Sequence, residues 1–67
     1  MQEVEDKLVH AMLVVKPGQA ETAEVWAGII GESLERTKAG LTSLVGKQKV
    51  QCRTGPTSPI YLLRDVD

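Results

Sequence analysis

The chain has 67 residues, 42% of them hydrophobic but only two of them aromatic, so it is long enough for one small domain with an aliphatic core. Its single cysteine, Cys52, excludes an intrachain disulfide, and with only His10 beside it the chain has too few soft ligands for a structural zinc site. The longest apolar run, residues 11–15, is far shorter than the roughly 20 residues that span a bilayer. We therefore expect a cytoplasmic protein with no cofactor, no metal and no membrane partner.

The formal net charge of −1 hides a strong segregation of charge along the chain. Residues 1–35 carry two lysines against seven acids, whereas residues 36–64 carry six lysines or arginines and no acid. A basic half of this kind is typical of a nucleic-acid-binding surface, because Lys and Arg neutralise phosphates. The alternative is that the charges cluster by chance and only solvate the surface.

Residues 3–15 are predicted to form the first helix, because apolar side chains recur there at helical spacing. The shared face carries Val4, Leu8, Ala11, Met12 and Val15. Val9 and Leu13 lie on the opposite side, where either other segments of the chain wrap them or a second subunit contacts them, and we expect wrapping. Lys16-Pro17-Gly18 ends the helix, and residues 19–20 are expected to form a short strand.

Residues 22–50 have the spacing and punctuation of two helices that meet at a tight corner. Thr22 is a suitable N-cap for the first of them, and Gly31 is placed to end it. Ser33 is the natural N-cap of the second helix. The residues expected to be buried in this pair are Trp26, Ala27, Ile30, Thr37, Leu41 and Leu44. The segment is therefore predicted to be a helix-turn-helix.

A β-hairpin is predicted after the second helix. From Val50 the side chains alternate between two faces, the pattern of a half-buried strand, and this predicts that Cys52 is a small buried residue. Residues 55–59, GPTSP, interrupt the strand, and residues 60–63 return as its partner. From this second strand one of the pair Tyr61 and Leu62 is expected in the core, since neighbouring side chains point to opposite faces.

This order of elements resembles the winged helix-turn-helix DNA-binding family, in which a Thr or Ser cap is followed by a small residue, Leu, Gly and a second Ser cap before the recognition helix. The matching positions are Thr22, Ala27, Ile30, Gly31, Ser33, Leu41 and Leu44, with Val50 opening the wing. Glu32, Thr37 and Gln48 depart from the pattern, since the family commonly has an apolar residue, Val and Gly there. Small fimbrial-operon regulators of the PapI/FaeA type are similar in length.

The resemblance implies a mainly α fold with a small β-hairpin, three helices plus a C-terminal wing, as a single domain over residues 1–67. It also implies a sequence-specific transcriptional regulator, associated with the nucleoid, with its recognition helix in the major groove and its wing on the backbone. Double-stranded DNA is then the partner. A larger DNA-bound regulator or a second copy of the chain, as a homodimer, is the further partner that this reading allows.

The second helix of the motif has an outward face. With Leu41 at the centre of the buried side, a step of about 100° per residue turns Ala39, Thr42 and Gly46 outward. The DNA-contacting residues predicted from this face, its flanks and the wing are Glu35, Arg36, Lys38, Ala39, Thr42, Ser43, Lys47, Lys49 and Arg53. The four cations expected in a single basic surface, away from the acids of residues 1–35, are Arg36, Lys38, Lys49 and Arg53.

In this interpretation Arg36 reads a guanine, Thr42 meets base edges, and the lysines contact phosphates. The alternative is an ordinary solvated helix face. No nucleophile elbow, paired histidines or Gly-rich phosphate loop occurs, so an enzyme is not expected. The competing function is a winged-helix protein-interaction or adaptor module with no DNA binding of its own, which would use the acidic first half, Trp26 and the second apolar face of the first helix.

Overall fold

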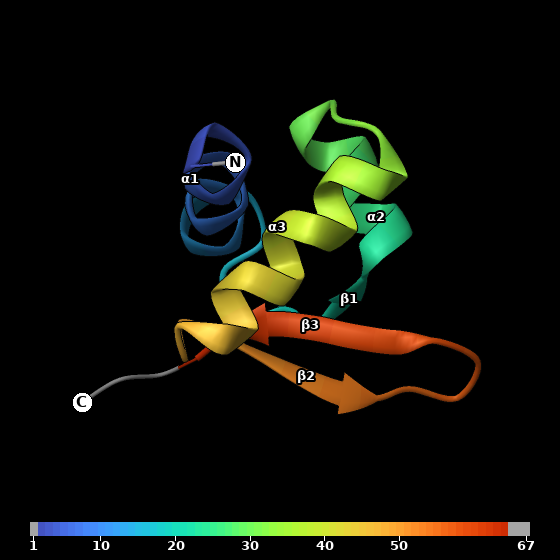
Figure 1. Ribbon diagram of the computed structural model, residues 1–67. Coiled ribbons are helices and arrows are strands. Elements are labelled where there is room, and N and C mark those ends of the chain that lie inside the picture. The colour runs from blue at the N-terminus through green and yellow to red at the C-terminus, as the bar shows by residue number, and fades with distance from the viewer. Residues whose placement is uncertain (1, 65–67) are drawn as a thin grey trace.

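The computed structural model describes residues 2–64, which form three helices and one three-stranded antiparallel sheet (Figure 1). The order is α1 (Gln2–His10), a π-helical turn η1 (Ala11–Val15), β1 (Glu21–Thr22), α2 (Ala23–Ile30), α3 (Leu34–Gly46), β2 (Val50–Thr54) and β3 (Pro59–Leu63). The expected three helices and C-terminal hairpin are confirmed. The ends of the expected domain, residues 1 and 65–67, lie outside the described residues.

The first helix changes its geometry after His10, and this overturns part of the predicted register. The amide of Lys16 donates to the carbonyl of Ala11 at 2.9 Å, five residues back, so the last turn is wider than an α-helical one. A wider turn rotates each residue by less than 100°, so Val15 turns away from the core and is 55% exposed. Leu13 is 56% exposed, so the expected wrapping of that side is wrong there, although Val9 is half-buried.

The predicted corner between α2 and α3 is confirmed in its details. Thr22 Oγ1 accepts a hydrogen bond from the amide of Val25 at 3.3 Å, and Ser33 Oγ accepts one from the amide of Arg36 at 3.2 Å. These side chains satisfy amides that have no partner inside the first turn of each helix. Between them Gly31 takes the left-handed conformation, φ 72°, which a residue without Cβ adopts freely.

The sheet has the strand order β1-β3-β2, so the hairpin is joined to the helices through β1. Glu21 pairs with Tyr61 and Thr22 with Ile60, two residues later than the strand predicted at residues 19–20. The amide of Gln19 instead closes a turn by donating to the carbonyl of Lys16 at 3.2 Å, so Gln19 cannot start the strand. The second hairpin strand begins at Pro59, one residue earlier than predicted.

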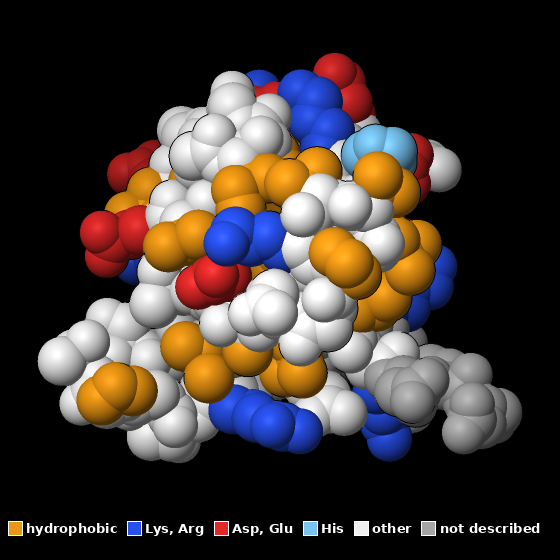
Figure 2. Space-filling view, turned by 180° about the vertical axis from the view of Figure 1, so that it is seen from behind, with side chains coloured by type: hydrophobic (Ala, Val, Ile, Leu, Met, Phe, Trp, Pro, Cys, Tyr) orange, Lys and Arg blue, Asp and Glu red, His pale blue; other side chains and the backbone are white. Residues whose placement is uncertain are grey.

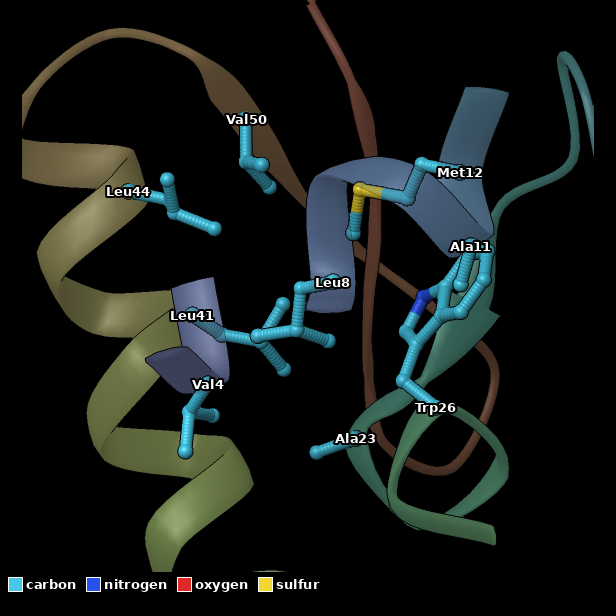
Figure 3. Close-up of a cluster of buried hydrophobic side chains, with 9 residues drawn as sticks. All are labelled: Val4, Leu8, Ala11, Met12, Ala23, Trp26, Leu41, Leu44 and Val50. Carbon is cyan, nitrogen blue, oxygen red and sulfur yellow. The ribbon is translucent and has the colours of Figure 1, made fainter. Parts of the chain in front are cut away.

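The core lies where α1, α2 and α3 meet the near end of the hairpin (Figure 3). Its members are Val4, Leu8, Ala11, Met12, Ala23, Trp26, Leu41, Leu44 and Val50. Gly40 lets α1 approach α3 closely, because a Cβ built there would lie 2.9 Å from Val4 Cγ1. Of the remaining predicted core residues, Ala27 is buried, Ile30 is only half-buried, and from the second hairpin strand Tyr61 packs against the core.

The prediction that Cys52 is buried is wrong, since this side chain is exposed. Along β2 only Val50 is buried, and the strand becomes more exposed towards Thr54. Figure 1 shows the reason, because the closed end of the hairpin extends beyond the helices. Alternating polarity identifies a strand but does not say where that strand leaves the body of the protein.

Candidate nucleic-acid interface

The outward face of α3 is exposed as predicted. Its buried residues are Thr37, Gly40, Leu41 and Leu44, which face α1 and the core. The exposed residues on the opposite side are Glu35, Ala39, Thr42 and Gly46. Three of these four have small side chains, so a large partner molecule could approach the backbone of α3 closely on this face.

One flank of this face meets the hairpin. Lys38 and Thr42 of α3 line a pocket of about 270 Å³ together with Ser58, Pro59 and Tyr61 of the hairpin. Thr22, Ala23 and Glu24, at the start of α2, complete the lining. We call this the α3–hairpin pocket. It brings an ammonium group, a carboxylate, three hydroxyl-bearing side chains and a phenol ring to one concavity formed by segments that lie far apart in the sequence.

The hairpin wall of this pocket is anchored to the helical body. Trp26 is fully buried, and its indole Nε1 donates to the carbonyl oxygen of Tyr61 at 2.9 Å. The indole N–H, the only donor of this buried side chain, therefore has a partner, and the hydrogen bond links β3 to α2. Burial raises the pKa of Tyr61, and the neighbouring Cys52 adds to this effect, so the phenol stays protonated at neutral pH and can donate a hydrogen bond.

The other flank of the α3 face turns towards α1. Arg36, Ser43 and Lys47 share this edge, because they are seven and four residues apart on a helix. Lys47 Nζ lies 2.7 Å from Glu5 Oε1 of α1. Arg36 Nη1 lies 3.5 Å from Glu32 Oε1 at the α2–α3 corner. The expectation that the acids of residues 1–35 lie away from the basic residues is therefore wrong for these two carboxylates.

Neighbouring cations lower the pKa values of both carboxylates, so their ionised forms are favoured. The hydrogen bond from Lys47 lowers the pKa of Glu5 against the opposing effect of burial, and Ser43 adds to the lowering. Lys7 Nζ lies 2.6 Å from Glu32 Oε2, and this contact lowers the pKa of Glu32 and raises that of Lys7. Glu32 thus occupies the position where the resembled family has an apolar residue, and an ion pair with α1 replaces the apolar contact.

Lys49 and Arg53, the two cations of the predicted basic surface that follow α3, lie apart from each other. Arg53 and the exposed Cys52 border a second hollow along the closed end of the hairpin. Lys49 borders a hollow of about 150 Å³ between α1 and the end of α3, together with Lys47 and Asp6. Of the nine predicted residues, only Lys38 and Thr42 line the α3–hairpin pocket, and the four cations are spread over the molecule.

Sequence reasoning missed the roles of Glu5, Glu32 and Lys7, as well as the wall formed by Ser58 and Pro59. A weak signal existed for Glu32, which departs from the expected apolar residue in the turn. Comparison of the chain with protein-family models and with curated proteins gave no match. Within residues 2–64, no helix combines the length and the apolar character needed to cross a membrane, and no three potential ligands among His, Cys, Asp and Glu cluster as a metal site.

Proposed function

We propose that the chain is a duplex-DNA-binding domain of the winged helix-turn-helix type that acts in transcriptional regulation. In this proposal α3 faces the duplex, and the β2–β3 hairpin is the wing. The observation that carries the proposal is the α3–hairpin pocket, where Lys38 and Thr42 meet the hairpin residues Ser58, Pro59 and Tyr61. In this proposal the recognition helix and the wing would therefore contact the duplex at the same pocket.

The chemistry of the pocket suits a sugar–phosphate backbone. The ammonium group of Lys38 supplies the positive charge, and the hydroxyl groups of Ser58 and Tyr61 supply donors for phosphate oxygens. Glu24, at the α2 wall, is the one acid of the lining. Pro59 and the Tyr61 ring offer apolar surface for a sugar. Ala39 and Gly46 let the duplex approach α3 closely, because no long side chain there holds it off.

Sequence preference would come from a small set of contacts. The guanidinium group of Arg36 is directed towards Glu32, so the α3 side chain best placed to meet base edges is that of Thr42. One short side chain reads little sequence directly, and the remaining preference would come from the shape and deformability of the duplex. We therefore include sequence-specific regulation in the proposal, with backbone contacts as the main source of affinity.

The direct test is a salt titration of duplex binding by fluorescence anisotropy. Lys38 and Arg53 make no ion pair with another side chain among residues 2–64 and border the two hollows of the hairpin, so two phosphates would be neutralised. Log affinity should then fall with log salt at a slope of about −2. Lys38→Gln should reduce that slope by about one unit for every sequence.

Lys16→Gln is the matched control, because Lys16 pairs with Glu21 at 3.2 Å and does not line the pocket. Its slope should equal that of the unmodified chain. The dependence of affinity on duplex shape is then measured with three duplexes: an A-tract DNA, a DNA rich in pyrimidine–purine steps, and an RNA. Absence of duplex binding at low salt, or an unchanged slope for Lys38→Gln, would contradict the proposal.

A second candidate function is a protein-interaction module, and one observation favours it. Leu13, Val14 and Val15 in η1 are 56%, 63% and 55% exposed and adjacent in sequence. Figure 2 shows hydrophobic side chains gathered on this side of the molecule, next to the histidine. Such a patch is typical of a contact surface. This function predicts no duplex binding at low salt and a monomer–dimer or partner equilibrium in sedimentation that Val14→Glu abolishes.

A further inference from the structure

Two acidic residues form ion pairs with the basic residues along one edge of α3. A helix that faces DNA would bind more tightly if those basic residues were free to contact phosphates. The edge consists of Arg36, Ser43 and Lys47, and the acids are Glu5 and Glu32. Both carboxylates come from outside α3, one from α1 and one from the turn that precedes α3. The Glu5–Lys47 contact is therefore tertiary. Glu32 is only four residues from Arg36, but its contact with Lys7 ties it to α1.

Glu5 is placed almost entirely inside the α1–α3 contact. Its side chain is 9% exposed, and its Oε1 accepts a hydrogen bond from Lys47 Nζ at 2.7 Å. The residue follows Val4, which packs under α3 against Gly40. Because the two helices pack closely there, the backbone of Glu5 is held at a fixed position beside the end of α3.

Glu32 is fixed from two directions. Its side chain is 13% exposed, and its two oxygens contact Lys7 at 2.6 Å and Arg36 at 3.5 Å. Lys7 comes from α1, so the carboxylate is held in place whether or not Arg36 remains beside it. Arg36 itself is 56% exposed in its side chain, as Lys47 is at 55%, and both cations would otherwise be accessible to a phosphate.

A phosphate that approached this edge would meet a different electrostatic situation from one at Lys38. At Lys47 it would approach the fixed carboxylate of Glu5 as well as the cation, so attraction and repulsion would largely cancel. At Arg36 the carboxylate of Glu32, which Lys7 shares, would weaken the attraction without cancelling it. Lys38 forms no ion pair with an acid of the described residues, and the hairpin donors line the same pocket. Glu24 also lines this pocket, but it is exposed and is not paired with Lys38. The two flanks of α3 therefore differ in effective charge although both carry basic residues.

We propose that Glu5 and Glu32 determine which flank of α3 binds nucleic acid, by reducing the positive charge on the α1 side and leaving the Lys38 side with the hairpin as the binding side. This inference rests on the proposed DNA binding. It assigns the acids a role in specificity: they weaken the attraction of phosphates to Arg36 and Lys47, and so disfavour a second, rotated docking of the duplex along α1.

The test is a pair of double-mutant cycles in duplex affinity and its salt slope. Glu5→Gln keeps the shape and removes the charge, so Lys47 becomes available for one more phosphate. One further phosphate contact should steepen the slope by about 0.9 and raise affinity by about eightfold at 0.1 M salt. Lys47→Ala alone should change affinity by less than about twofold, and in the Glu5→Gln background it should cancel the gain.

Glu32→Gln with Arg36→Ala forms the second cycle, with the same expected pattern. Glu3→Gln is the matched control, since it removes the same charge from an exposed position of α1 and should leave the slope unchanged. Circular dichroism and the thermal midpoint establish that each variant is folded.

The outcomes separate the inference from the proposed function. A gain in Glu5→Gln that Lys47→Ala removes supports the inference. An equal gain in Glu3→Gln, or a gain that survives Lys47→Ala, overturns it, as does an unchanged affinity in Glu5→Gln when the unmodified chain binds with a slope that depends on Lys38. If neither the unmodified chain nor any variant binds a duplex at low salt, the proposed function fails as well.

Discussion

The helical body and the far half of the hairpin differ in how tightly their side chains are packed. In the body, α1 and α3 approach so closely that Gly40 has no room for a side chain, and nine residues form one continuous core. In the hairpin only Val50 is buried, and the two strands past it contact the body mainly through β1 and the Trp26–Tyr61 hydrogen bond. Stability therefore belongs chiefly to the body, whereas the hairpin is free to serve a surface role.

The largest expected effect is that of Leu41→Ala. Leu41 is fully buried in the core, so its truncation removes apolar burial and leaves a cavity, at a cost of about 2–5 kcal/mol in the free energy of unfolding. A domain of this size can lose its fold at such a cost. Urea unfolding followed by circular dichroism measures the change. An unchanged unfolding midpoint would show that α3 does not pack through this residue.

Gly40→Ala tests the close approach of α1 and α3. The new Cβ would lie 2.9 Å from Val4 Cγ1 and 3.1 Å from Leu8 Cδ1, so these side chains or the two helices must shift, at a cost of about 1–3 kcal/mol. Gly28→Ala is the matched control, because nothing lies within 4 Å of its added Cβ. That variant should gain up to about 1 kcal/mol from helix propensity. Equal midpoints for the two variants would contradict the close contact.

Thr37→Val is a change in the core of the helical body that should raise stability instead of lowering it. Thr37 is fully buried, and its Oγ1 has no hydrogen-bond partner among the described residues. Valine has the same shape without the hydroxyl, so the variant should be more stable by about 1 kcal/mol, measured as a higher thermal midpoint. A loss of stability would mean that the hydroxyl has a partner in solution.

The ion pairs that link the body predict a modest dependence on pH. The pKa values of Glu5 and Glu32 are lowered from 4.5 in the folded protein, so their contribution is complete above about pH 4.5 and is lost as the pH falls through the lower folded values. The thermal midpoint should fall with acidification in that range, and by less in the Glu5→Gln, Glu32→Gln double variant. Identical pH profiles would exclude these groups as the cause.

Gly55→Ala should have a small effect on stability and a clear one on binding. An added Cβ would lie 2.3 Å from the carbonyl oxygen of Ser58, which also accepts the hydrogen bond of the Gly55 amide at 3.1 Å. The closed end of the hairpin must therefore rearrange, while the core keeps its contacts. We expect a loss of stability of about 1 kcal/mol, because the clash is with the backbone but is confined to the exposed end of the hairpin, and a weaker affinity for duplex DNA. A large loss of stability with unchanged affinity would reverse this assignment.

The sequence predicted best those features that depend on neighbouring residues. The caps at Thr22 and Ser33 and the turn at Gly31 are local, and all three are present as expected. The stripe of Leu8, Met12, Leu41 and Leu44 follows from helical spacing and is buried. Local rules are strong at these positions because capping and amphipathic packing favour the same conformation.

The features that the sequence did not predict depend on distant parts of the chain. No local signal marks the π-helical turn at Ala11–Val15, and strand alternation cannot say that β2 leaves the body before Cys52. Lys47 and Glu5 are 42 residues apart in sequence, so their pairing follows only from the α1–α3 contact. The same holds for the α3–hairpin pocket, whose lining spans residues 22–61.

The most direct test of the account is an NMR titration of the ¹⁵N-labelled chain with a short DNA duplex at low salt. The account predicts that the largest amide shift changes fall on Lys38, Thr42 and the Ser58–Tyr61 segment, with small changes along α1 and at Leu13–Val15. Changes concentrated on η1, or the absence of any change on adding the duplex, would contradict it.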